Sequence, residues 1–157
     1  MVLQTIMRKW QRFSNLSGFE RAIVIKAAAG LAATKVGLRI AGFRRWKDMF
    51  SRLEPPTRRG EFTFSLYETA KMISRLESAA ARNLFFRPNC LENSLVLWWL
   101  LRNRGITAQL RVGARKTGQR LEAHAWVECD GVVLNEPEET HLHFKPFGGP
   151  ITSIERR

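Results

Sequence analysis

Two short stretches of the sequence carry residue types that could perform nucleophilic chemistry. The first is Arg87–Leu95, in which Cys90 opens a strongly apolar segment, and the second is Ala123–Trp126, which contains His124. A cysteine nucleophile needs a thiol that is already partly thiolate and a base within hydrogen-bond reach. Cys90 and His124 are 34 residues apart in the sequence, so only the fold can bring them together.

The local sequence places Cys90 at the start of a helix. Pro88 disfavours a helical conformation at the residue before it, and Asn89 with Glu92 forms a capping-box pattern. Cys90 is then the first helical residue, where unpaired backbone N–H groups and the positive end of the helix dipole favour the thiolate. The same residue could instead be a small buried apolar side chain, as many intracellular cysteines are.

The second stretch predicts a strand in which His124 shares one face with Glu122, Trp126 and Glu128. A histidine in this position can accept the proton of a thiol while Trp126 excludes water from the site. A lone half-buried histidine in a strand is more often only structural. The functional interpretation therefore rests on its pairing with Cys90.

The residue that orients the histidine depends on the register of the next hairpin. A two-residue Asp130–Gly131 loop places Asn135 on the His124 face, whereas a loop that is one residue longer sets Glu136 opposite His124. An amide and a carboxylate can both hold an imidazole in cysteine enzymes, so both candidates stay open.

An acyl-transfer site also needs hydrogen-bond donors for the developing oxyanion. The backbone N–H of Cys90 is the first candidate, and Asn83 or Asn89 could add a side-chain donor. His141 and His143 form an H-x-H pattern, but no further ligands at suitable spacing accompany them, so we expect no metal. The sequence has no glycine-rich phosphate loop, and we expect no cofactor.

The elements that must position these residues follow from capping signals and hydrophobic periodicity. Capping boxes at Ser17 with Glu20 and at Ser65 with Glu68 open two helices, and the period later changes from helical to alternating. Helices followed by a small antiparallel sheet predict an α+β fold. The predicted helices cover residues 18–40, 66–83 and 90 to about 103, and the predicted strands cover residues 109–115, 121–128 and 132–136.

Positive charge is concentrated in the first part of the 157-residue chain. The net charge is +12; residues 1–60 hold 13 lysines and arginines against 3 acidic residues, and residues 61–157 hold 13 against 11. A proline-rich linker at residues 54–60 marks the change, so we predict a basic helical extension over 1–60 and a second domain over 61–157. Such a charge suits an acidic partner, a membrane surface or nucleic acid, and it is equally typical of a helical surface that is merely solvated.

Other features of the sequence bear on partners and compartment. Phe43–Lys47 interleaves basic and aromatic residues, but Trp46, Met49 and Phe50 follow helical spacing, so we favour packing on the core over nucleic-acid binding. Two cysteines suit a reducing compartment. The most apolar stretch, residues 22–42, is interrupted by basic side chains and is a poor membrane span. We therefore predict a cytoplasmic protein without a nucleic-acid partner.

Several segments together resemble one enzyme family. They are Cys90–Leu91, Ser94–Leu95, Leu97–Leu101, Arg104–Ile106, Leu110–Gly113 and Ala123–Glu128. In this order and context they resemble the transglutaminase-like cysteine peptidases that remove the leader from lasso-peptide precursors. The resemblance covers residues 85–147 well and the helix start at residues 16–20 more loosely.

The resemblance implies a papain-like or transglutaminase-like cysteine peptidase domain over residues 61–157, with Cys90 as nucleophile and His124 as general base. It also implies an acidic residue after the histidine strand, and Glu136, 12 residues after His124, occupies that position. Glu136 at that position favours the longer hairpin loop. The family more usually has aspartate there, and often a basic residue where this chain has Asn93.

In such families a small winged-helix-like domain, fused or separate, recognises the leader. The first 60 residues read as helices without the strands that this domain needs, so the resemblance implies a separate leader-recognition protein. It also implies a cyclase that closes the macrolactam ring of the released core peptide. ATP coupling is associated with the family, although this chain shows no nucleotide motif. A transglutaminase-type acyl transferase and a non-catalytic peptide-binding module remain as alternatives.

Overall fold

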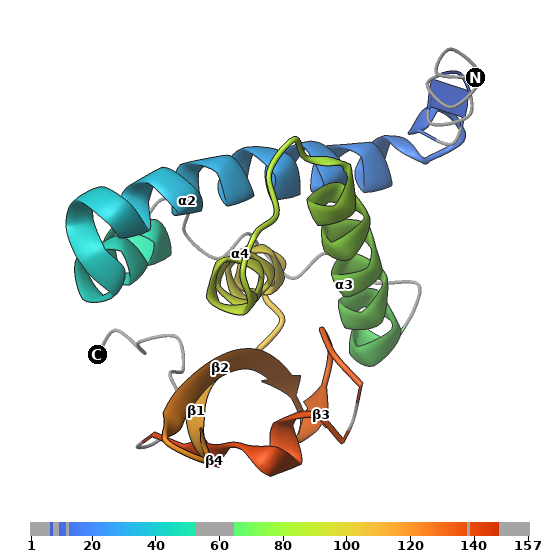
Figure 1. The fold of residues 1–157 in the computed structure, drawn as a ribbon. Coiled ribbons are helices and arrows are strands. Elements are labelled where there is room, and N and C mark those ends of the chain that lie inside the picture. The colour runs from blue at the N-terminus through green and yellow to red at the C-terminus, as the bar shows by residue number, and fades with distance from the viewer. Residues whose placement is uncertain (1–6, 8–9, 12, 53–64, 138, 148–157) are drawn as a thin grey trace.

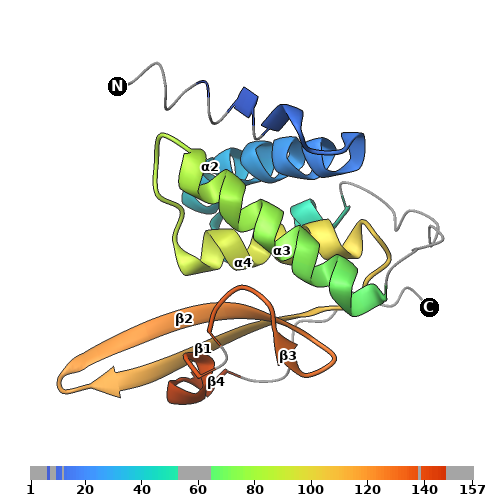
Figure 2. The same ribbon diagram turned by 90° about the vertical axis from the view of Figure 1, so that its right-hand side faces the viewer.

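A computed structural model describes residues 7, 10–11, 13–52, 65–137 and 139–147 (Figure 1). Three long helices of the described part lie together on one side of a four-stranded antiparallel sheet (Figure 2). This two-layer arrangement confirms the predicted α+β class. The helices are α2 (Gly18–Arg52), α3 (Leu66–Asn83) and α4 (Cys90–Arg102), and the strands are β1 (Gln109–Thr117), β2 (Arg120–Cys129), β3 (Val132–Val133) and β4 (Lys145–Pro146).

The predicted linker at residues 54–60 lies outside the described residues. The predicted division between residues 60 and 61 therefore stays a prediction. Within the described ranges, no helix is long and apolar enough to cross a membrane.

Helix α2 begins where its capping box predicts and packs against both α3 and α4 (Figure 1). The Ser17 hydroxyl accepts a hydrogen bond from the Glu20 N–H at 3.2 Å, and the Glu20 carboxylate accepts one from the Ser17 N–H at 2.8 Å. Ile23, Ala27 and Leu31 place its inner face in the hydrophobic core. The helix thus belongs to the same packed layer as the two helices that follow.

The end of α2 differs from the prediction. The helix was expected to stop near Ile40, but it bends at Gly42, whose φ of 73° is left-handed, and then continues. The bend returns Trp46 to the first half of the helix, where its Nε1 donates to the buried Thr34 hydroxyl at 3.2 Å. The indole lies so close to Gly37 that a Cβ there would clash with it. Trp46 is a core residue, as its helical spacing predicts.

Helix α4 forms the centre of the core, with α2, α3 and the sheet around it. Every residue from Ser94 to Leu101 is buried. The helix ends at Arg102, and Gly105 follows with a left-handed φ of 69°, as the predicted stop signal requires. Because the rest of the helix is enclosed, its first turn, which holds the half-buried Cys90, is the part that a substrate can approach.

The sheet differs from the predicted one in the lengths of its strands. Strands β1 and β2 are longer than expected and pair along their whole overlap. Strand β3 was predicted over residues 132–136 but stops at Val133. Strand β4 was not predicted; it pairs with the middle of β1 after a short 3-10 turn at His141–His143.

One carboxyl group is buried within the helical layer. Glu77 in α3 is 1% exposed, and its Oε1 has no hydrogen-bond partner among the described residues. Loss of hydration raises the pKa of Glu77 from its ordinary value of 4.5 to about 8, against the smaller opposing effects of Arg82 and Ser78. Glu77 is therefore mostly protonated at neutral pH.

The buried Glu77 predicts a stability that falls as the pH rises. The unfolded chain releases this proton near pH 4.5 and the folded chain near pH 8, so the free energy of unfolding decreases between these values. Glu77→Gln keeps a neutral side chain and is expected to remove most of this slope. Urea unfolding of both proteins from about pH 5 to about pH 9 measures the effect. The same dependence of the unfolding free energy on pH in both proteins would contradict this prediction.

Candidate active site

Cys90 is the first residue of α4, as predicted. The Asn89 Oδ1 accepts a hydrogen bond from the Glu92 N–H at 2.8 Å, and the Glu92 Oε2 accepts one from the Asn89 N–H at 2.9 Å. This complete capping box sets the helix start and takes up the Glu92 N–H, which leaves the N–H groups of Cys90 and Leu91 beside the thiol. Asn89 thus supports Cys90 through the cap.

One of the two side-chain donors proposed for an oxyanion is used elsewhere, because the Asn83 Nδ2 donates to the Ala79 carbonyl at 2.7 Å within α3. The Asn89 side chain takes part in the capping box of α4 through its acceptor oxygen Oδ1, so the box does not use its amide N–H groups. The backbone N–H groups of Cys90 and Leu91 are further candidates, because the first N–H groups of a helix have no partner within it.

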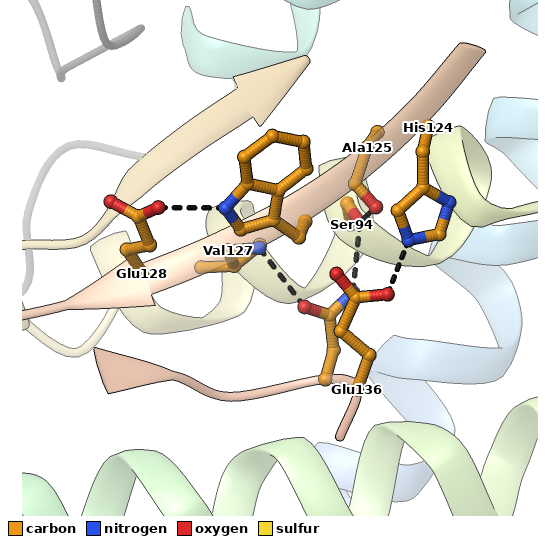
Figure 3. Close-up of polar contacts among 8 residues, drawn as sticks. Ser94, His124, Ala125, Val127, Glu128 and Glu136 are labelled. Atoms are coloured by element: carbon orange, nitrogen blue, oxygen red, sulfur yellow. Dashed lines mark hydrogen bonds and ion pairs between the residues drawn. The ribbon is translucent and has the colours of Figure 1, made fainter. Parts of the chain in front are cut away.

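His124 lies in β2 with its imidazole held on several sides. Its Nε2 pairs closely with the Glu136 Oε2 (Figure 3). The Phe144 ring lies 4.9 Å from the imidazole and the Trp126 indole is stacked 6.2 Å from it, measured between centroids. With Nε2 held by the carboxylate, Nδ1 is the nitrogen available to a thiol.

The hairpin register is not the one that the resemblance favours. Cys129 pairs with Val132, so the loop holds only Asp130 and Gly131, with φ values of 50° and 80°. Two positive φ values are typical of a type I′ turn, which an Asp-Gly pair suits. The expectation of a three-residue loop is therefore wrong.

Glu136 nevertheless reaches His124, because the chain leaves the ladder after Val133. In a continued β3 of this register, Glu136 would pair with Ala125 and point to the face opposite His124. The chain instead bends over residues 134–136 and brings the carboxylate round to the imidazole. The predicted contact is present, although the predicted strand is not.

Asn135 makes its hydrogen bonds away from the imidazole. Its Oδ1 accepts from the Val127 N–H at 2.9 Å, and its Nδ2 donates to the Ser94 hydroxyl at 2.8 Å (Figure 3). Of the two candidates that the sequence left open, Glu136 is the one beside His124.

Trp126 forms a fixed wall beside His124. It is 1% exposed, and its Nε1 donates to Glu128, which also pairs with the Arg111 guanidinium at 3.0 Å. The ring lies over Gly113, where a Cβ would come within 3.0 Å of the indole and 2.9 Å of a β4 carbonyl oxygen. Such packing leaves the indole no room to turn.

A hydrogen bond joins α4, one turn after Cys90, to the residue that follows His124 in β2. Cys90 and Ser94 are four residues apart and share one helix face. The Ser94 hydroxyl donates to the carbonyl of Ala125, the residue after His124, at 2.8 Å. No hydrogen bond joins the thiol and the imidazole in the part of the chain described, and catalytic hydrogen bonds often tighten only when substrate binds.

Two residues at this site were not expected from the sequence. The spacing of four residues between Cys90 and Ser94 is the signal that could have pointed to Ser94, but it was not used. No local signal marks Phe144, because it reaches His124 through β4, a two-residue strand that periodicity does not detect.

The H-x-H histidines do not converge on one point. His141 packs against Trp126 with centroids 5.9 Å apart, whereas His143 is exposed. Across the described ranges, no three histidine, cysteine or acidic side chains gather into a group that could hold a metal ion.

Comparison with protein families adds to this geometry. The profile of the transglutaminase-like superfamily matches residues 30–148, from within α2 to beyond β4. The chain belongs to the transglutaminase-like superfamily. Members of this superfamily are typically cysteine hydrolases or acyltransferases. No curated protein and no solved structure shows a significant match.

The two free cysteines of this transglutaminase-like protein are expected to differ in reactivity. Burial, with a smaller contribution from Asp130, raises the pKa of the Cys129 thiol, which is 3% exposed. Cys90 is half-buried in the first turn of α4, where an alkylating agent can reach it. Iodoacetamide is expected to alkylate Cys90 at least about tenfold faster than Cys129 near neutral pH. Peptide mass mapping measures both rates, and equal rates would contradict the assignment.

Proposed function

We propose that the protein is a cysteine peptidase that removes the leader from a lasso-peptide precursor in the cytoplasm. The pairing of His124 with Glu136 carries the proposal. His124 lies on β2, and β2 is hydrogen-bonded to α4, the helix that begins with Cys90. Membership of the superfamily supports cysteine-based hydrolysis or acyl transfer. The lasso-peptide substrate rests on the resemblance of the segments around the cysteine and the histidine.

In the proposed reaction, His124 Nδ1 takes the proton of Cys90 and the sulfur attacks the carbonyl carbon at the leader–core junction. The oxyanion accepts hydrogen bonds from the N–H groups of Cys90 and Leu91 in the first turn of α4. The C–N bond then breaks, leaving the leader as a thioester, and the imidazolium gives its proton to the amine of the core. Water attacks the thioester with His124 as base, which releases the leader acid and restores the thiol.

Glu136 holds the imidazole during these steps. A carboxylate on Nε2 keeps the hydrogen on that nitrogen, leaves Nδ1 as a base and stabilises the imidazolium that forms. The His124 and Glu136 side chains are 20% and 9% exposed, so the pair is largely shielded from water. The longer reach of glutamate, compared with the aspartate usual in the family, suits a carboxylate that arrives from an irregular segment.

Two other functions would use the same residues differently. An acyltransferase would pass the acyl group of the thioester to an amine instead of to water. A non-catalytic peptide-binding module would keep the fold without a reactive thiol. The mass of the product separates hydrolysis from acyl transfer, and the alkylation rate of Cys90 separates both from the binding module.

A cleavage assay tests the proposed reaction. The precursor peptide from the same gene neighbourhood is incubated with its recognition protein and with wild type, Cys90→Ala or Cys129→Ala. Wild type and Cys129→Ala are expected to cut one bond, since Cys129 packs in the core, whereas Cys90→Ala is expected to lose all cleavage. Mass spectrometry locates the cut. Equal cleavage by wild type and Cys90→Ala would remove Cys90 as the nucleophile.

The proposal includes a separate recognition protein that delivers the precursor and a cyclase that receives the core. The outer surface of α2 supports a docking role, because Gly18–Arg52 holds eight lysines and arginines against two acidic residues. Ile25, Val36 and Ile40 fall on one side of this helix and are 59%, 56% and 81% exposed. A basic surface with exposed apolar side chains suits an acidic leader or recognition protein.

Neutralising this surface tests docking. We expect replacement of Arg21, Arg39, Arg44 and Arg45 by glutamine to raise KM about tenfold with kcat nearly unchanged, because the loss affects binding and not the reacting groups. Glutamine at the exposed Lys116 and Arg120, at the tip of the β1–β2 hairpin, is the matched control. Unchanged KM in the α2 variant would remove the docking role. Binding of wild type, but not of that variant, to anionic vesicles would instead point to a membrane surface.

A further inference from the structure

A short chain of buried hydrogen bonds links three segments of the site. The Ser94 hydroxyl, which is 0% exposed, donates to the Ala125 carbonyl at 2.8 Å and accepts from the Asn135 Nδ2 at 2.8 Å. The Asn135 Oδ1 accepts from the Val127 N–H at 2.9 Å. Figure 3 shows these bonds beside the pairing of His124 with Glu136. The chain therefore joins α4, β2 and the segment after β3.

Each end of this chain of bonds is next to a residue of the proposed reaction. Ser94 lies one helical turn after Cys90 on the same face. Ala125 follows His124, and Asn135 precedes Glu136. A shift of any of the three segments would therefore move one reacting or orienting group relative to the others.

We propose that Ser94 and Asn135 are positioning residues that hold Cys90, His124 and Glu136 in fixed positions relative to one another. We call these two residues the clamp. The inference rests on the proposed function, because it assigns the clamp to the same cysteine site. Neither side chain touches the reacting atoms in this assignment; both act through the segments that carry them.

The backbone of β2 shows why these two side chain types are needed. The Leu134 N–H still donates to the Val127 carbonyl at 3.0 Å, but the return bond expected from a continued β3 is missing. The Val127 N–H bonds to Asn135 instead, and the Ala125 carbonyl, next in line on that edge, bonds to Ser94. An amide supplies an acceptor and a donor, and a hydroxyl donates and accepts at once. The Val127 N–H and the Ala125 carbonyl of β2 therefore have hydrogen-bond partners although no strand continues beside them.

Loss of the clamp is expected to loosen the site more than it changes the fold. Ser94→Ala would leave the Ala125 carbonyl without its hydroxyl donor in a buried place, where such a group is costly. Asn135 lies in an irregular, half-buried segment, so Asn135→Ala is expected to fold even if Ser94→Ala does not. Thr34→Val is the matched control, because it removes a buried hydroxyl bonded to Trp46 within α2.

The test is the pH dependence of Cys90 alkylation by iodoacetamide, followed by peptide mass mapping in protein shown to be folded by circular dichroism. In the proposed reaction His124 removes the proton of Cys90, so wild-type Cys90 is expected to stay reactive at about pH 6. Both clamp variants are expected to lose this low-pH reactivity by about tenfold while their rates at about pH 9 stay within about threefold of wild type. Thr34→Val is expected to keep the wild-type profile.

The outcomes separate the clamp from the proposed function. Clamp variants with the wild-type profile would overturn the positioning role and leave the peptidase intact. A wild-type Cys90 without reactivity at low pH would overturn the proposed function itself, and the positioning role with it. A Thr34→Val profile that falls as far as those of the clamp variants would show a general effect of stability and would also overturn the positioning role.

Discussion

The structure of the site depends on one departure from regular strand pairing. In the observed register, a continued β3 would carry Glu136 to the face of the sheet opposite His124. The chain leaves β2 after Val133, and β2 then lacks partners for backbone groups that a sheet normally satisfies. Ser94 and Asn135 satisfy them from α4 and from the departing segment. The end of regular pairing at Val133 is thus what allows Glu136 to pair with His124.

The helical layer supplies the other half of the site. Helix α4 is apolar over almost its whole length and is enclosed by α2, α3 and the sheet, so its position is set by packing on every side. Only its first turn is free to carry chemistry, and that turn holds Cys90. A rigid helix with one accessible end is a suitable support for a nucleophile, because the thiol then moves only with the core.

Features that depend on neighbouring residues could be predicted from the sequence, whereas features that depend on distant segments could not. The start of α4 depends on capping residues next to Cys90, so the sequence alone was sufficient. The bend of α2 at Gly42 and the end of β3 at Val133 depend on packing against distant segments, and neither was predicted. Glu136 was expected beside His124 because of the resemblance, with the wrong loop length. The contact is present because the chain bends after Val133. Without this bend, the observed register would place Glu136 on the opposite face of the sheet from His124.

The close approach at Gly113 has a consequence for how this sequence can change over evolutionary time. Gly113 pairs with His124 across the sheet and is covered by Trp126 and β4. Glycine is the one residue without a Cβ, so every missense change at this codon adds a carbon 3.0 Å from the indole and 2.9 Å from the β4 carbonyl oxygen. Changes elsewhere in β1 can accumulate one methyl group at a time, but at this position even the smallest change requires Trp126 or β4 to move. A lineage that lost this glycine would therefore shift groups that pack beside His124 in the same step.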